Sequence, residues 1–194
     1  MFVRHGHLSL LLLVAVAVAV AGCGGGGAAA TTPLAPLVPR STHPPALPAG
    51  WTRVVDRRQG LSFGLPPGWR ATRRAGTTQV RSADRALALT IAIDRSAGGA
   101  TPAAYETATL AALRGYDGMK RRPARAVIDV PYAAASASAM GTLRSTGVRQ
   151  RIVAIGLAPT SGTIVSLLSF SSARASASRY VGPLTRLVRT VFVG

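Results

Sequence analysis

Histidine and cysteine are almost absent from this chain of 194 residues, which contains three histidines and one cysteine. Residues 51–194 contain neither type. That stretch therefore lacks the most frequent general base, the thiol nucleophile and the commonest ligands of transition metals. We expect it to hold no metal and no cofactor. The lone Cys23 also has no partner for an intramolecular disulfide.

Acidic residues are scarce as well, with six Asp and Glu against 23 Lys and Arg. None pairs with another at helical or strand spacing, so neither a two-carboxylate glycosidase nor a calcium site has local support. Two acids distant in sequence could still meet in the fold. Each also has a structural interpretation, such as Asp84 in a turn, Asp94 at a strand end and Glu106 in the first turn of a helix. The others are Asp56, Asp117 and Asp129.

Serine is abundant, but no Gly-x-Ser-x-Gly elbow occurs, and the only lysine, Lys120, has no serine three residues before it. Gly98-Gly99 lacks the lysine and the strand-to-helix context of a phosphate-binding loop. We therefore expect no enzymatic activity.

An apolar run from Leu8 to Gly22 follows Arg4 near the N-terminus. It has the length of the hydrophobic region of a signal peptide and is short for a transmembrane helix, which needs about 20 residues. It ends at Cys23 and a run of glycines that would form a poor membrane helix. We predict a signal peptide over residues 1–22.

Val20, Ala21 and Gly22, directly before Cys23, resemble the lipobox of bacterial lipoproteins. This motif implies cleavage before the cysteine and a diacylglyceryl group on its thiol. Two acyl chains suffice for stable anchoring, so we predict a lipid anchor on the extracytoplasmic face of the cell membrane. The alternatives are a secretory signal with an incidental cysteine and an uncleaved anchor.

Residues 24–50 consist mainly of Gly, Ala, Thr and Pro, with prolines spaced so that neither helix nor strand can persist. We predict that residues 23–50 form the lipidated cysteine and a disordered linker. The remaining residues, 51–194, have the length of one domain.

Turn signals divide this domain into short elements. We predict one hairpin over 52–56 and 61–64 and a second over 77–82 and 86–94. The alternation of Leu87, Leu89, Ile91 and Ile93 places one face of the last of these strands in the core.

A helix over 101–114 is indicated by Thr101 as N-cap and Pro102 at the first position. Its expected buried residues are Tyr105, Ala108, Ala112 and Leu113. Three more strands over 132–140, 148–158 and 163–171 precede a final helix over 178–189, with Leu184, Leu187, Val188 and Val191 at helical spacing. This order predicts an α+β domain, an antiparallel sheet of about six or seven strands flanked by helices.

The order of these elements, with the string GLSFGLPPGW over residues 60–69, resembles the PsbP-like fold. That fold is an α/β/α sandwich shared by the photosystem protein PsbP and a yeast nuclear-import factor that binds the Ran GTPase. The chain also resembles actinobacterial lipoproteins of the LpqN type, in which a lipobox and a Pro-rich tether precede such a domain. The resemblance covers residues 51–194 and implies a noncatalytic binding module. The arginine excess and the alanine-rich segment 133–140 depart from the family pattern.

Arginines give the chain a formal net charge of +17. Part of this excess is what a GC-rich genome would encode, and solvated surface charge is an alternative to a binding role. Four basic clusters could meet anions: Arg57 with Arg58, Arg73 with Arg74, Lys120-Arg121-Arg122 with Arg125, and Arg149 with Arg151. Of these, the candidate anion or partner sites are Arg73 and Arg74, and Lys120, Arg121, Arg122 and Arg125. An exported domain meets lipid headgroups and anionic envelope polymers, so we expect no nucleic-acid partner.

The resulting hypothesis is a membrane-anchored, noncatalytic binding or adaptor module of the cell envelope, with other envelope proteins or anionic polymers as partners. In an alternative hypothesis, the domain carries a lipophilic small molecule beside the sheet, where the small side chains of Ala133–Ala139 leave room.

Overall fold

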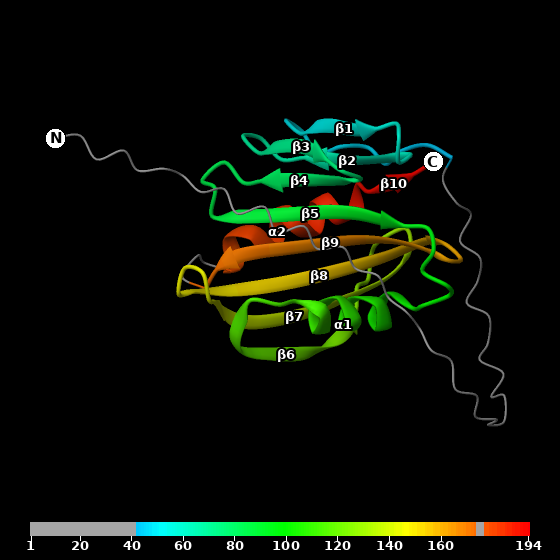
Figure 1. The fold of residues 1–194 in the computed structure, drawn as a ribbon. Helices are drawn as coiled ribbons and strands as arrows, with labels where there is room; N and C mark the ends of the chain where they lie inside the picture. The colour runs from blue at the N-terminus through cyan, green and yellow to red at the C-terminus, as the bar shows by residue number, and fades with distance from the viewer. Residues whose placement is uncertain (1–41, 174–176) are drawn as a thin grey trace, which may run out of the picture. The chain divides into compact units, whose positions relative to one another are not determined.

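A computed structural model describes residues 42–173 and 177–194, which belong to one compact unit (Figure 1). The predicted signal peptide, Val20, Ala21, Gly22 and Cys23 lie outside these residues, as does most of the predicted linker. The described end of that linker, residues 42–50, contains no helix or strand. Within the described part, no helix is both long and apolar enough to span a bilayer.

The described residues form ten strands and two helices. One helix follows the fifth strand and the other follows the ninth. In order they are β1 (Thr52–Asp56), β2 (Leu61–Leu65), β3 (Arg70–Arg74), β4 (Thr77–Arg81), β5 (Leu87–Asp94), α1 (Pro102–Ala112), β6 (Tyr116–Ala126), β7 (Ala133–Leu143), β8 (Val148–Thr160), β9 (Thr163–Ser172), α2 (Ala177–Arg189) and β10 (Phe192–Val193).

The strands form two antiparallel sheets. The main sheet has seven strands in the order β3-β4-β5-β9-β8-β7-β6, and the smaller sheet has the order β1-β2-β10. The predicted hairpins β1–β2 and β4–β5 are confirmed, as is the pairing of β8 with β9. The predicted antiparallel sheet of about six or seven strands, flanked by helices, is present as the main sheet. The first predicted hairpin is not part of it, because β2 pairs with the C-terminal β10 and forms the smaller sheet with β1 and β10. The domain is thus richer in strands than an α/β/α sandwich implies.

The two outermost strands of the main sheet, β3 and β6, were not among the predicted elements. Both are mostly exposed, and their sequences, RATRR and YDGMKRRPARA, are dominated by basic residues instead of alternating apolar ones. Exposed edges are commonly protected from pairing with other chains by charged side chains and proline. Pro123 and the bulges of β6 fit this role.

The helices cover opposite faces of the main sheet, α1 in front and α2 behind in Figure 1. On the α2 side, the fully buried Leu89 and Ile91 of β5 share a core with Phe63 of the smaller sheet and Leu187 of α2. The expected inward alternation of β5 and the expected apolar face of α2 are therefore confirmed.

Helix α1 begins as predicted, because the Thr101 hydroxyl accepts a hydrogen bond from the Ala104 amide at 3.2 Å. Of the residues expected on its buried face, Leu113 is buried and Tyr105 and Ala112 are half-buried, whereas Ala108 is exposed. The buried residues within α1 itself are Glu106 and Leu110. The burial of Glu106 could not be predicted from the sequence, because a charged residue is rarely fully buried without a partner.

Candidate functional site

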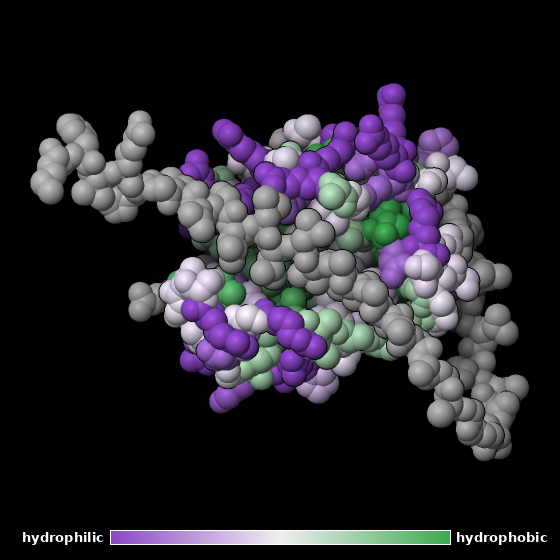
Figure 2. All heavy atoms as spheres, in the orientation of Figure 1, coloured by the Kyte–Doolittle hydropathy of each residue, from purple (hydrophilic) through white to green (hydrophobic). Residues whose placement is uncertain are grey.

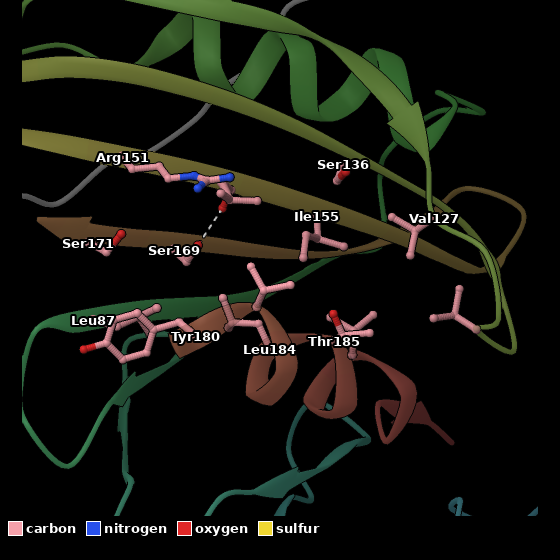
Figure 3. Close-up of a pocket in the computed structure, with 14 residues that line it drawn as sticks. Leu87, Val127, Ser136, Arg151, Ile155, Ser169, Ser171, Tyr180, Leu184 and Thr185 are labelled. Atoms are coloured by element: carbon pink, nitrogen blue, oxygen red, sulfur yellow. Dashed lines mark hydrogen bonds between the residues drawn. The ribbon is translucent and has the colours of Figure 1, made fainter. Parts of the chain in front are cut away.

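A pocket of about 230 Å³ lies between α2 and the rear face of the main sheet (Figure 3). Its sheet wall comes from β5, β7, β8 and β9, its opposite wall from α2, and one end from the loop that follows β6. The described lining residues are Leu87, Val127, Val130, Ser136, Arg151, Val153, Ile155, Ser169, Ser171, Tyr180, Val181, Leu184, Thr185 and Val188.

The pocket exists because small side chains lie where the sheet faces α2. Ser136, Ser169 and Ser171 line it at positions where larger residues would fill the space beneath the helix. The Ser169 hydroxyl donates to the Val153 carbonyl oxygen at 3.0 Å, so this polar group is satisfied within the sheet (Figure 3). The remaining surface is mainly aliphatic, as is typical of small-molecule sites.

The alanines of β7 do not leave the room that we predicted for a lipophilic ligand. Ala135, Ala137 and Ala139 are buried on the other face of the strand, where Ala137 and Ala139 share a core cluster with Leu110 of α1. Their small size lets α1 approach the sheet closely. The serines that alternate with them face α2, and this period-two alternation is the sequence signal that would have located the pocket.

Arg151 is the charged residue of the pocket lining. It is half-buried and lies between Met140 and Ser171 on the neighbouring strands. Figure 3 shows it on the sheet wall opposite Tyr180 and Leu184. None of the ion pairs among the described residues involves Arg151. A half-buried guanidinium without a carboxylate partner, next to an apolar space, is suited to bind the anionic group of a ligand.

The first turn of α2 is fixed to the β4–β5 turn through Asp84. This carboxylate accepts hydrogen bonds from the Tyr180 hydroxyl at 2.6 Å, the Ser82 hydroxyl at 2.6 Å and the Ala86 amide at 3.1 Å. Arg179 adds an ion pair at 3.3 Å. The hydrogen bonds from Ser82 and Tyr180 lower the pKa of Asp84 to about 2. The turn interpretation of Asp84 is confirmed, and its further role is to hold one end of the pocket wall.

The last turn of α2 is tied to the loop at the other end of the pocket. Arg189 lies 3.4 Å from the Asp129 carboxylate, and Val127 and Val130 of the same loop line the pocket. Both partners are largely exposed, so this pair contributes little stability. The pocket is therefore held firmly at the end near Asp84 and weakly at the end near Asp129.

Exposed aliphatic side chains lie at both ends of the pocket, Ile128 in the loop that follows β6 and Val181 next to Tyr180 on α2. Ile128 is 76% exposed and Val181 is 54% exposed, although both are large hydrophobic residues. Such residues enlarge the apolar surface available to a ligand or partner.

The two predicted basic clusters do not form one site. Arg73 and Arg74 lie on β3, whereas Lys120, Arg121, Arg122 and Arg125 lie on β6, at the opposite edge of the seven-stranded sheet. Figure 2 shows hydrophilic side chains over both edges. Arg121 has a structural contact, because its Nε donates to the Leu110 carbonyl oxygen at 3.2 Å near the end of α1.

Across the described residues, no group of three or more His, Cys, Asp or Glu side chains is arranged to hold a metal ion. Asp94 is the last residue of β5 and accepts hydrogen bonds from Ser96 and Tyr105, in keeping with its predicted structural role at a strand end.

The sequence matches no family model and no curated protein. Several solved structures have a fold similar to that of this chain. Cyanobacterial PsbP from Synechocystis sp. PCC 6803 aligns with a TM-score of 0.52 at 15% identity, covering 82% of this chain and all of that one. Mog1p, a Ran-binding protein of Saccharomyces cerevisiae, aligns with a TM-score of 0.53 at 9% identity, covering 74% of this chain and 95% of that one.

A protein from Bacteroides thetaiotaomicron aligns with a TM-score of 0.52 at 11% identity over 73% of this chain, which spans about half (48%) of that protein's length. LpqN of Mycobacterium tuberculosis, described as involved in cell envelope biogenesis, aligns with a TM-score of 0.47 at 13% identity over 74% of this chain and 90% of its own. A TM-score below 0.5 does not by itself establish a shared fold. The chain therefore has a PsbP/Mog1-like fold, and the lipoprotein assignment stays a prediction.

Proposed function

We propose that this domain is a noncatalytic binding module that holds the alkyl chain of a small anionic amphiphile beneath α2. The observation that carries the proposal is the half-buried Arg151, without an ion-pair partner among the described acids, on the wall of an otherwise mainly aliphatic pocket. The apolar surface of the pocket binds the alkyl chain of the ligand, and the guanidinium group of Arg151 binds its anionic group.

The size of the pocket favours a ligand with one short alkyl chain over a ligand with a bulky ring system. Drug-sized ligands occupy sites of about 300–1,000 Å³, whereas this pocket measures about 230 Å³. A water molecule occupies about 30 Å³ of liquid, and a methylene group is of similar size. The pocket therefore accommodates roughly eight methylene groups, each of which contributes about 0.8 kcal/mol when buried.

A lipid tether is the second part of the proposal. Val20, Ala21, Gly22 and Cys23 resemble a lipobox, and the Gly- and Pro-rich linker that follows would hold the domain near the extracytoplasmic face of the cell membrane. A ligand released from that membrane would then meet the pocket at high local concentration.

An adaptor function toward another envelope protein is the second candidate. It is favoured by the exposed Ile128 and Val181 beside the pocket, since exposed aliphatic residues often mark protein interfaces. Mog1p, which shares the fold, is a Ran-binding protein and shows that such a domain can serve recognition.

The ligand proposal is tested by titrating octanoate into the isotopically labelled domain and following backbone amide shifts by NMR. We expect saturable shifts around the pocket, a roughly tenfold loss of affinity in Arg151→Gln, and no binding in Ser136→Leu, whose larger side chain fills the space. Arg149→Gln is the matched control, because it removes the same charge two residues away on β8 and does not line the pocket. Equal losses in both arginine variants would refute the role of Arg151.

The tether is tested by intact-mass analysis of protein purified from membranes of its own host, beside a Cys23→Ala form. We expect a chain that starts at Cys23 and carries added acyl mass, both features being lost in the variant. An unmodified cysteine, or retention of residues 1–22, would contradict the lipid anchor.

A further inference from the structure

A second concave surface, which we name the basic hollow, lies between the β1–β2 turn and the β3–β4 turn. It has a volume of about 760 Å³ and shares no lining residue with the pocket beneath α2. Arg57 and Arg58 of the first turn meet Arg73 and Arg74 of β3 there. The fold therefore joins two arginine pairs that are separate in sequence and belong to different sheets.

Asp56 forms the fixed base of the basic hollow. It is only 5% exposed and accepts a hydrogen bond from the Arg58 amide at 3.1 Å. Arg73 lies 3.3 Å from the same carboxylate and also donates to the Val55 carbonyl oxygen. Arg73 is therefore a structural residue that joins the two sheets.

Gln59 links the two turns across the basic hollow. Its side-chain amide donates to the Gly76 carbonyl oxygen, and this bond joins the two turns. The main-chain carbonyl oxygen of Gln59 accepts a hydrogen bond at 2.8 Å from Arg95, which follows β5 and further fixes the β1–β2 turn. A site that is ordered before binding loses less entropy when a ligand arrives.

The other three guanidinium groups, on Arg57, Arg58 and Arg74, are exposed and make no ion pair with any described acid. Protection of the β3 edge would account for Arg74. It does not account for Arg57 and Arg58, which lie in a turn of the other sheet. Three like charges that converge on one concave surface repel one another until an anion binds between them.

We infer that the basic hollow binds a phosphate group, presented either by a soluble or polymeric phosphate or by a lipid headgroup. One arginine fork satisfies both oxygens of a carboxylate, whereas three forks match the greater number of oxygens and the higher charge of a phosphate. This site is independent of the alkyl-chain pocket, so either proposal can fail without the other.

The test is calorimetric titration of the full domain with tripolyphosphate at low salt, where screening is weak. The triple variant Arg57→Gln/Arg58→Gln/Arg74→Gln leaves the Asp56–Arg73 pair intact. The control Lys120→Gln/Arg122→Gln/Arg125→Gln removes the same charge from β6 at the far edge. We expect the first variant to lose roughly tenfold or more in affinity and the control to stay within about twofold of the unaltered domain.

Equal losses in the two triple variants would show that the overall charge, and not the basic hollow, attracts the anion, and would overturn the inference. Absence of binding by the unaltered domain would overturn it too. Sedimentation with phosphatidylglycerol vesicles then distinguishes the sources. Binding that needs the three arginines and is displaced by tripolyphosphate identifies a lipid headgroup, whereas tripolyphosphate binding without vesicle binding identifies a soluble or polymeric phosphate.

Discussion

Replacement of Glu106 by Gln will remove most of the dependence of stability on pH between pH 5 and pH 8. Glu106 is completely buried on α1, where its side chain lies against Gly156 of β8. Neither carboxylate oxygen makes a well-formed hydrogen bond within the described structure. Burial therefore raises the pKa of Glu106 from 4.5 to about 7, and the nearby Ser166 hydroxyl only partly opposes this shift.

The direction of the effect follows from proton binding. The folded state binds the Glu106 proton more tightly than the unfolded chain does, so the contribution of Glu106 to the free energy of unfolding is highest below about pH 4.5. It falls as the pH rises toward 7 and is constant above that. A pKa difference from 4.5 to about 7 corresponds to about 3 kcal/mol, at about 1.4 kcal/mol per pH unit.

The measurement is urea unfolding at pH 5 and at pH 8, followed by Trp51 and Trp69 fluorescence. Glu106→Gln should match the unaltered domain at pH 5 and be more stable at pH 8 by up to about 3 kcal/mol. Asp129→Asn is the control, since it neutralises an exposed carboxylate and should leave the slope unchanged. Equal losses of stability by Glu106→Gln and the unaltered domain between the two pH values would show that ionisation of Glu106 does not cause the pH dependence.

Three further substitutions test other parts of the structure. Tyr180→Phe removes a hydrogen bond to Asp84 and should raise the pKa of that carboxyl above about 2, as a carbon-detected NMR titration would show; an unchanged pKa would refute the contact. Ala75→Asn should raise stability by up to about 1 kcal/mol in urea unfolding, because Ala75 has a φ of +37° and Asn tolerates positive φ better; a loss of stability would contradict this. Ala137→Leu should destabilise the domain by about 1–3 kcal/mol by forcing α1 from the sheet, whereas a neutral result would mean that there is unused space.

Elements with strong local signals could be predicted from the sequence. The β4–β5 hairpin, the N-cap of α1 and the apolar face of α2 each follow from a few neighbouring residues, and the structure has all three. The edge strands β3 and β6 could not be predicted in this way, because a strand with little buried surface needs no apolar alternation. The pairing of β10 with β2 joins the two ends of the domain and also lacks a local signal.

The two candidate sites depend on contacts between distant segments. The sequence shows that β7 alternates alanine with serine, but not which set faces which helix. The approach of Arg57 and Arg58 to Arg74 depends on how the two sheets pack, and the separation of β3 from β6 depends on strand order. For this reason the basic clusters could be identified from the sequence, whereas their arrangement could not.

An alkyl chain that binds between α2 and the main sheet would bring its protons close to the methyl groups that line the pocket. Isotope-filtered NOE spectroscopy of the labelled domain with unlabelled octanoate tests this binding most directly, by detecting which methyl groups contact the ligand. We predict NOEs from the alkyl protons to the methyl groups of Val153, Leu184 and Val188, which line the pocket. NOEs confined to the exposed Ile128, or found only on the α1 face of the sheet, would show that no alkyl chain binds beneath α2.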